Sequence, residues 1–226
     1  MIYLYSGTPG SGKSLHQAKD IYQWLRRGRT CIANFDIDVT KIPKAKGNFI
    51  YLDNEYLKPE TLVKFSQVYF RDHQFKEGRL RVYIDECQLL FNAREWNITG
   101  RKEWLSFFTQ HRKYGYDIYL IAQFDRMIDR QIRSLIEYEV IHRKASNFGT
   151  LGILLGMLSG GNLFVAVTMW YPMKEKIESS FFRADKKYYS LYDTYNTFGA
   201  AGDGIEKGGL NGSDQGNKRL LKSVSS

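Results

Sequence analysis

The chain has 226 residues, of which 43% are apolar, and its 33 basic and 24 acidic residues give a formal net charge of +9. This size and apolar content predict one α/β domain with a substantial core, while two cysteines, Cys31 and Cys87, are too few and too far apart for a zinc motif and are expected as reduced thiols. The positive surplus favours an anionic partner, either nucleic acid, an acidic protein or a membrane surface, although solubility alone would explain it equally well.

The first pattern along the chain is a glycine-rich loop at residues 7–14. Its sequence, Gly-Thr-Pro-Gly-Ser-Gly-Lys-Ser, matches the phosphate-binding P-loop G-x-x-x-x-G-K-[ST]. The apolar residues 2–5 predict a strand directly before it and argue against a secretory signal peptide. Residues 15–25 carry apolar side chains at helical spacing, and Gly28 ends that pattern. Strand, loop and helix in this order are what the motif requires, which disfavours an incidental turn.

We expect this loop to bind the phosphates of ATP. Glycines allow the backbone to wrap closely around an anion, and the start of the following helix adds free N–H donors. Lys13 is predicted to contact the β- and γ-phosphates, and the Ser14 hydroxyl to ligate the Mg²⁺ that bridges them. The predicted nucleotide-binding residues are Thr8, Pro9, Gly10, Ser11, Gly12, Lys13 and Ser14.

The rest of the chain alternates between strand and helix patterns as far as residue 142. Such alternation predicts a parallel sheet with right-handed crossovers. Strands are expected at residues 30–35, 80–84, 118–122 and 138–142, and helices at residues 62–75, 103–114 and 128–135.

Polar residues follow two of these strands and predict the second half of an ATP site. Asp85 ends the strand at 80–84 and is expected to hold Mg²⁺ as a Walker B aspartate. Glu86 beside it would activate a water for attack on the γ-phosphate, a step that a small-molecule kinase does not need. Gln123 ends the strand at 118–122 and is a candidate γ-phosphate sensor. The alternatives are a solvated turn for the two acids and a polar strand terminus for Gln123.

Arginines near the site strands are candidates for an arginine finger that stabilises charge on the phosphates of a neighbouring subunit. Arg112 precedes the strand at 118–122, and Arg133 follows it, as do Arg126 and Arg130. Arg112 and Arg133 are the first choices, although most exposed arginines are simply solvated.

Two stretches in the last third differ in character from the rest. Residues 148–171 carry no charge and are long enough to cross a bilayer, but a Ser-Gly-Gly-Asn turn at 159–162 and strand formers at 163–170 favour a loop, a short apolar segment and a strand instead. Residues 199–226 are rich in glycine and predict a disordered tail. We therefore expect an ATPase domain at 1–198, with a strand-rich extension at 143–198, followed by the tail.

Several stretches together resemble the zonula occludens toxin (Zot) family, which includes the gene I assembly protein of filamentous phages. They are the P-loop, Tyr-Ile-Asp-Glu at 83–86, Thr-Gln-His-Arg-Lys-Tyr-Gly-Tyr-Asp-Ile at 109–118 with Ala-Gln at 122–123, and Tyr-Ser-Leu-Tyr-Asp-Thr at 189–194. The P-loop is generic, so the Gln-His-Arg-Lys-Tyr-Gly stretch and the Tyr-Asp-Thr ending carry the resemblance, which covers about residues 1–195.

The resemblance implies an inner-membrane ATPase whose cytoplasmic domain drives phage assembly and extrusion. The fold would be the additional-strand class of P-loop NTPases, which contains RecA-like and FtsK/HerA-like motors, with a small C-terminal β extension. ATP and Mg²⁺ would be its cofactors. Its partners would be further copies of itself, with a ring as one arrangement, phage single-stranded DNA or its coat and packaging proteins, and envelope-channel and inner-membrane assembly proteins. It would act in the host cytoplasm, at the cytoplasmic face of the inner membrane.

One departure from the family concerns the membrane anchor. Family members carry a transmembrane helix after the ATPase domain, whereas here a glycine-rich tail follows, so we expect either a shortened chain or a variant recruited by another membrane protein. The toxin activity of one family branch has no support in these residues. Two other functions stay open, a nucleotide-dependent scaffold without turnover and a nucleoside or nucleotide kinase, and Glu86 and Gln123 favour the hydrolase over the kinase.

Overall fold

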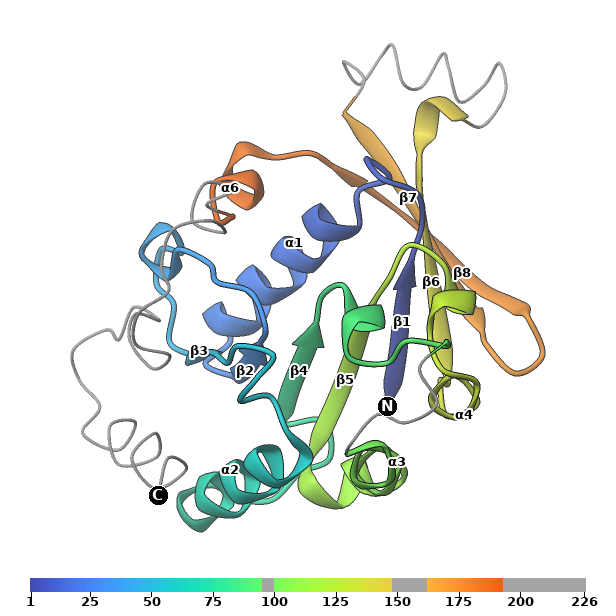
Figure 1. The fold of residues 1–226 in the computed structure, drawn as a ribbon. Helices are drawn as coiled ribbons and strands as arrows, with labels where there is room; N and C mark the ends of the chain where they lie inside the picture. Colours follow the sequence, from blue (N-terminus) through green and yellow to red (C-terminus); the bar gives the residue numbers. More distant parts are fainter. Residues whose placement is uncertain (95–99, 148–161, 193–226) are drawn as a thin grey trace.

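An eight-stranded sheet organises the parts of the chain that the computed structural model describes, residues 1–94, 100–147 and 162–192 (Figure 1). The strand order is β3-β2-β4-β5-β1-β6-β7-β8, with parallel pairing from β3 to β6 and antiparallel pairing of β7 and β8. The strands are β1 (Ile2–Ser6), β2 (Thr30–Ala33), β3 (Phe49–Tyr51), β4 (Leu80–Ile84), β5 (Tyr116–Ile121), β6 (Tyr138–Lys144), β7 (Leu163–Trp170) and β8 (Glu175–Arg183).

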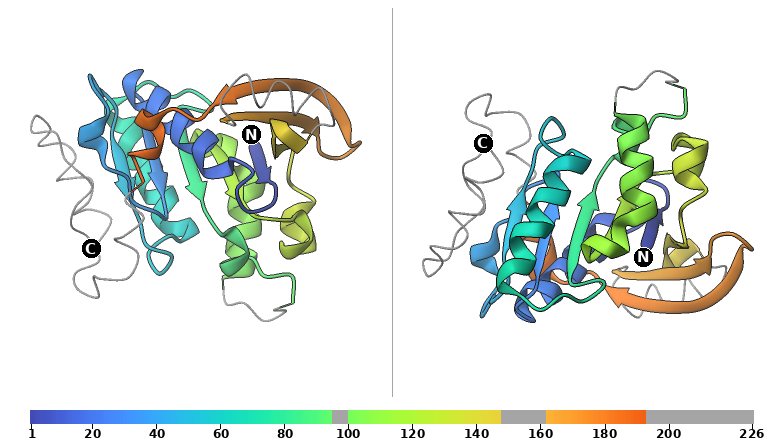
Figure 2. Two further views of the ribbon diagram at one scale, coloured as in Figure 1. Left: turned by 90° about the horizontal axis from the view of Figure 1, so that it is seen from above. Right: turned by 90° about the horizontal axis from the view of Figure 1, so that it is seen from below.

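Helices connect the strands and cover both faces of the sheet (Figure 2). The α-helices are α1 (Lys13–Arg26), α2 (Pro59–Asp72), α3 (Arg101–Gln110), α4 (Arg130–Arg133) and α6 (Lys186–Tyr189), and the short 3-10 helices are η1 (Val39–Lys41), η2 (Cys87–Leu89), η3 (His111–Tyr114), η4 (Asp125–Met127) and η5 (Ala145–Asn147). Successive residues of β1 point to opposite faces, so Leu4 packs with α2, α3 and α4, whereas Tyr5 packs with α1.

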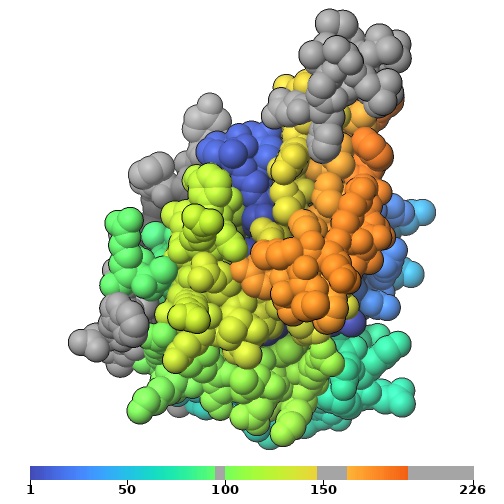
Figure 3. Space-filling view, turned by 90° about the vertical axis from the view of Figure 1, so that its right-hand side faces the viewer, coloured from blue at the N-terminus to red at the C-terminus, as the bar shows by residue number. Residues whose placement is uncertain are grey.

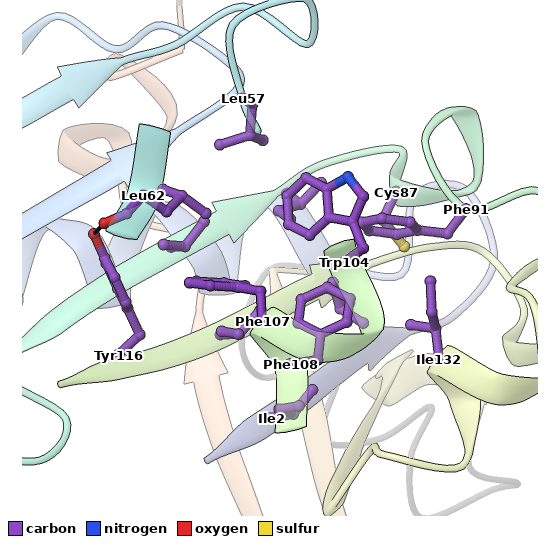
Figure 4. Close-up of a cluster of buried hydrophobic side chains, with 14 of the residues drawn as sticks. Ile2, Leu57, Leu62, Cys87, Phe91, Trp104, Phe107, Phe108, Tyr116 and Ile132 are labelled. Atoms are coloured by element: carbon purple, nitrogen blue, oxygen red, sulfur yellow. Dashed lines mark hydrogen bonds between the residues drawn. The ribbon is translucent and has the colours of Figure 1, made fainter. Parts of the chain in front are cut away.

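The aromatic residues Trp104, Phe107 and Phe108 of α3 lie in the core on the first of these faces (Figure 4). Tyr116 is fully buried beside them, and its hydroxyl donates a hydrogen bond of 2.8 Å to the carbonyl oxygen of Leu62. Both cysteines are also buried and their thiols are free. All of these side chains therefore belong to the hydrophobic core.

The strand order confirms the predicted sheet class. Strand β5 lies between β1, which leads into the P-loop, and β4, which leads into Asp85. This inserted strand gives the additional-strand class its name. Beyond β6 the sheet continues into β7 and β8, within the stretch predicted as a strand-rich extension, and this hairpin forms one flank of the molecule (Figure 3).

The predicted elements are present, with shifted bounds. The helix expected at 62–75 begins earlier because Pro59 occupies its first turn, a position where proline loses no hydrogen bond. The helix expected at 128–135 is only α4, which Asp129 caps by accepting hydrogen bonds from the backbone of Gln131 and Ile132. The edge strand β8 had no individual assignment, because most of its residues are exposed and polar and lack an apolar alternation.

The uncharged run at 148–171 is described only in its second part. There β7 confirms the predicted strand, and it pairs with β6 and β8 along its length. Within the described ranges, every helix is too short or too polar to cross a bilayer. The first three residues of the predicted turn at 159–162 and the predicted disordered tail lie outside the described residues.

Candidate nucleotide-binding site

The P-loop runs from the carboxyl end of β1 to the first turn of α1. Gly7 has φ 142° and Gly12 has φ 94°, conformations that favour glycine. A Cβ on Gly7 would lie 2.6 Å from the carbonyl oxygen of His142, and one on Gly12 would lie 2.6 Å from the ring of Phe164. Gly10, at φ 73°, has no atom within 4 Å of the corresponding position. The loop is therefore packed tightly against β6 and β7 at both ends and open in its middle, where a ligand would lie.

Lys13 points back into this loop. Its Nζ donates hydrogen bonds to the carbonyl oxygens of Gly7 at 2.5 Å and Thr8 at 3.3 Å. Burial lowers the pKa of Lys13, and the charges of Asp85 and Glu86 oppose that effect. The ammonium group and both acids of the predicted site are thus within electrostatic reach of one another.

The other loop residues divide into exposed and buried ones. Thr8, Pro9, Gly10 and Ser14 are exposed, as phosphate-binding and metal-binding groups must be before ligand arrives. Ser11 differs, because its side chain is buried behind the loop and its Oγ has no hydrogen-bond partner among the described residues. The Ser11 backbone N–H donates to the Thr8 carbonyl oxygen at 3.1 Å, so a bond from this N–H to phosphate would have to replace that contact.

Asp85 follows β4 at the same edge of the sheet. Its side chain is half-buried, and burial raises the pKa of its carboxyl against the opposing effects of the Glu86 N–H and the Lys13 ammonium. Its backbone is held by Asn34, whose Oδ1 accepts from the Asp85 N–H at 2.7 Å and whose Nδ2 donates to the Asp85 carbonyl at 2.9 Å. The sequence analysis did not identify Asn34 as a site residue. Its position could have indicated this, because it is a polar residue that directly follows β2, the strand next to β4.

Glu86 adopts a left-handed backbone conformation, φ 46°, which is rare for a residue with a side chain. Its N–H donates to Asp85 Oδ1 at 2.9 Å, and its exposed carboxylate accepts a hydrogen bond from the Gln88 side chain. Such backbone conformations are concentrated at functional sites. Here the two adjacent carboxylates differ in exposure, because Asp85 is half-buried and Glu86 is exposed to solvent.

Gln123 lies beside the loop through its backbone. Its carbonyl oxygen accepts from the Gly7 N–H at 3.2 Å, and its side chain is half-buried. The structure therefore brings Lys13, Asp85, Glu86 and Gln123 to one edge of the sheet, where β1, β4 and β5 end.

The donor set suits Mg²⁺ bound together with a phosphate ligand. In the part of the chain that the structure describes, no cluster of three or more His, Cys, Asp or Glu side chains could hold a metal unaided. Mg²⁺ commonly uses one or two protein ligands and takes the others from phosphates and water. The exposed Ser14 hydroxyl and the Asp85 carboxylate fit that pattern.

The two candidate arginine fingers lie apart from this edge. Arg112 is in η3, before β5, and so lies at the opposite, amino-terminal edge of the sheet, where its guanidinium contacts the Glu137 carboxylate. Arg133 is half-buried on α4, near Tyr171. Neither has a hydrogen bond to the four site residues among the described contacts, so each would have to act on the phosphates of another subunit.

Two histidines behind the P-loop were also missed in the sequence. His142 Nδ1 lies 3.1 Å from the Ser6 carbonyl oxygen, and His142 Nε2 lies 2.8 Å from His16 Nδ1. Because a carbonyl only accepts, His142 must donate through Nδ1 and accept from His16 when both rings are neutral. Burial lowers the pKa of His16 to about 4 and that of His142 to about 3. The first turn of α1 is thereby connected to β6 and β1.

Comparison with known proteins identifies the family to which the chain is similar. The model of one family, described as Zonular occludens toxin (Zot), matches residues 1–198. The chain is 27% identical over 206 residues to the Gene 1 protein of Enterobacteria phage I2-2, covering 87% of this chain and 56% of that protein. It is 26% identical over 212 residues to the Gene 1 protein of Enterobacteria phage M13, covering 87% and 60% respectively. It thus spans less than two thirds of these relatives.

Solved structures share the fold at low sequence identity. B204, the DNA-packaging ATPase of Sulfolobus turreted icosahedral virus, has a TM-score of 0.52 at 12% identity, covering 80% of this chain and 96% of that one. A second solved structure, an isolated ATPase domain, has a TM-score of 0.54 at 10% identity, covering 84% and 83%. Together with the strand order, these likenesses identify the fold as that of an α/β P-loop NTPase.

Proposed function

Because the chain belongs to the zonular occludens toxin (Zot) family, we propose that it is an Mg²⁺-dependent ATP hydrolase that powers the assembly and extrusion of a filamentous phage. The observation that carries the proposal is the meeting of the P-loop with Asp85 and Glu86 at one sheet edge, with β5 between their strands. The relatives that are phage Gene 1 proteins support the biological setting.

Each site residue has a distinct task in this proposal. Lys13 exchanges its bonds to the loop carbonyls for bonds to the β- and γ-phosphates. Ser14 and Asp85 hold Mg²⁺, which when bound neutralises charge on the phosphate oxygens. Glu86 accepts the proton of the attacking water at its exposed carboxylate, which Gln88 orients. Gln123, fixed to Gly7, is placed to contact the γ-phosphate.

An arginine cluster at the opposite edge of the sheet supports an anionic partner. Arg29 and Arg79 directly precede β2 and β4, whose first residues, Thr30 and Leu80, are paired, so the two arginines are neighbours. Burial lowers the pKa of Arg29, and the charges of Arg79, Arg81 and Arg27 lower it further. None of Arg27, Arg29 and Arg79 has an ion pair among the described contacts, whereas the nearby Arg81 is paired with Asp20 at 2.6 Å. Guanidinium groups suit phosphates, so we propose that phage single-stranded DNA contacts this edge.

The remaining partners follow the family resemblance. We propose a homo-oligomer, with a ring as one arrangement, that works with coat or packaging proteins and with envelope-channel and inner-membrane assembly proteins. We also propose that it acts in the host cytoplasm, at the cytoplasmic face of the inner membrane.

The decisive experiment separates ATP binding from turnover. Glu86→Gln should bind ATP with Mg²⁺ as the wild type does but lose steady-state hydrolysis by about 10²–10⁴-fold, the usual contribution of a general base. Glu103→Gln, on α3, is the matched control and should be fully active. Intact hydrolysis in Glu86→Gln would show that the base assignment is wrong. A wild-type protein that binds ATP without turnover would indicate the scaffold, and phosphate transfer only to an added acceptor would indicate the kinase.

A further inference from the structure

The hydroxyl of Tyr192 is buried and has no hydrogen-bond partner among the described residues. Buried hydroxyl groups in folded proteins nearly always have a partner, so this one requires an explanation. Tyr192 belongs to the Tyr-Ser-Leu-Tyr-Asp-Thr stretch at 189–194, which the proposed reaction leaves without a task.

The segment that carries Tyr192 is fixed firmly to the domain. Leu191 is fully buried, and its carbonyl oxygen accepts from the Asp38 N–H at 3.0 Å. The Ser190 carbonyl oxygen accepts from Lys41 Nζ at 2.9 Å. Asp38 and Lys41 both belong to the segment that follows β2. The position of Tyr192 is therefore fixed by contacts between its two preceding residues and this segment.

Tyr192 lies next to the residues that hold Asp85. Its ring stacks on that of Phe35 with centroids 5.6 Å apart, and Phe35 follows Asn34, which binds both backbone groups of Asp85. Burial and then the charge of Asp85 raise the pKa of Tyr192 well above its usual value. Tyr192 and the half-buried Asp85 therefore both contact the Asn34–Phe35 segment, next to the metal-binding edge.

The Asp85 carboxylate has capacity for another donor. Its Oδ1 accepts one hydrogen bond, from the Glu86 N–H, whereas an ionised carboxylate offers about four lone-pair sites. Carboxylates that ligate metal ions are usually held by donors outside the ligand set, which fix their orientation.

We propose that Tyr192 is a positioning residue of the nucleotide site, whose hydroxyl donates a hydrogen bond to the Asp85 carboxylate when Mg²⁺ and ATP are bound. This inference rests on the proposed binding of Mg²⁺ and ATP and adds to it. The bond would connect the metal-binding edge to the carboxyl-terminal segment of the domain, so that nucleotide state and the order of that segment become linked.

The test uses the full chain and the variant Tyr192→Phe, with Tyr189→Phe as the control, because Tyr189 is an exposed tyrosine at the end of α6, three residues before Tyr192. ATP affinity is measured by calorimetry during Mg²⁺ titration and separately in EDTA. We expect Tyr192→Phe to need about 10- to 100-fold more Mg²⁺ for half-saturation, the usual effect of losing an outer donor, with unchanged affinity in EDTA. Tyr189→Phe should match the wild type.

A second readout follows the segment itself. Hydrogen exchange at the Asp38 N–H, which is bonded to the Leu191 carbonyl oxygen, should slow when Mg²⁺ and ATP bind to the wild type, and should not slow in Tyr192→Phe. An unchanged Mg²⁺ requirement, an equal loss of affinity in EDTA, or slowing that persists in the variant would each overturn the proposal. A wild type that binds no ATP would instead overturn the proposed function, a separate outcome.

Discussion

The imidazoles of His16 and His142 lie 2.8 Å apart, Nδ1 to Nε2, directly behind the phosphate-binding loop. His16 also stacks on Phe182 of β8, with centroids 4.9 Å apart, while Phe164 of β7 lies against Gly12. The β7–β8 extension therefore packs on the first turn of α1 through aromatic rings. The contact between the two imidazoles needs one N–H donor and one unprotonated nitrogen, so the two rings cannot both be protonated while it persists.

This histidine pair predicts a loss of stability in acid. Well above pH 6.5 neither ring binds a proton in the folded or the unfolded chain. Between pH 6.5 and the folded-state pKa values of about 4 and 3, the unfolded chain takes up protons that the folded chain does not. The free energy of unfolding should therefore decrease as the pH decreases, by up to about 1.4 kcal/mol per pH unit for each histidine. Urea unfolding between pH 7 and pH 4 measures this slope.

The variant His142→Asn removes one of the two titrating rings while keeping a donor for the Ser6 carbonyl oxygen. The decrease in its free energy of unfolding per pH unit should be smaller than that of the wild type by the contribution of one histidine. The buried His111, whose pKa is also lowered by burial, contributes equally to both proteins. His73→Asn, an exposed position, is the control and should keep the wild-type slope. Equal slopes in His142→Asn and the wild type would show that the pair does not titrate as the structure implies.

Asn34 predicts a second effect on stability and metal binding. Asn34→Ala leaves the N–H and carbonyl of Asp85 without their partners, which should cost about 1–3 kcal/mol in the free energy of unfolding. Asn54→Ala is the matched control, because Asn54 accepts from Asn34 but does not contact Asp85. Asn34→Ala should also raise the Mg²⁺ concentration needed for ATP binding, whereas Asn54→Ala should not. A stable Asn34→Ala variant with normal Mg²⁺ dependence would contradict the role assigned to this amide.

The core of the site was predictable from local sequence because its chemistry is local. The P-loop, Asp85, Glu86 and Gln123 each directly follow an apolar strand, and parallel strands put their carboxyl ends at one edge. The sheet order then follows from alternating strands and helices together with the family resemblance.

The other features depend on which distant segments meet, and single-sequence patterns do not specify that. His16 and His142 are 126 positions apart, and Asn34 meets Asp85 across 51 positions. The edge strand β8 was equally hard to predict. Most of its residues are polar, and its apolar residues Ile177 and Phe181 are exposed because no further strand covers that edge of the sheet. Arg112 shows the opposite case. It is close in sequence to the start of β5, but it lies at the amino-terminal edge of the sheet, opposite the edge that carries the P-loop.

The arginine cluster predicts a salt-dependent interaction with single-stranded DNA. Arg27→Ala and Arg79→Ala should each weaken binding and reduce the slope of log affinity against log salt by about 0.7, the value for one lost contact to a single-strand phosphate. Lys64→Ala removes the same charge from an exposed position on α2 and is the control. Fluorescence anisotropy with a labelled oligonucleotide at several salt concentrations measures both quantities. Slopes that fall equally in all three variants would show that only net charge matters.

The last prediction concerns the arginine fingers, which must act between subunits if they act at all. Arg133→Ala and Arg112→Ala should bind ATP normally, since neither arginine has a hydrogen bond or ion pair to the nucleotide site of its own chain among the described residues. The one that serves as a finger should lose hydrolysis by about 10³-fold or more. Loss of the Arg112–Glu137 pair should change stability by less than about 1 kcal/mol, because Arg112 is 49% exposed and solvent screens the pair.

Mixing two inactive variants tests action between subunits directly. Lys13→Ala lacks a working P-loop but keeps both arginines, so in a mixed oligomer it can supply a finger to the intact P-loop of an arginine variant. Activity should return on mixing Lys13→Ala with the arginine variant that is inactive alone, and it should rise with the fraction of mixed interfaces. Mixing Lys13→Ala with Glu86→Gln is the control, because a proton acceptor acts within its own site and should not be replaced by a neighbour to the same extent. Full activity of both arginine variants alone would show that hydrolysis needs neither residue.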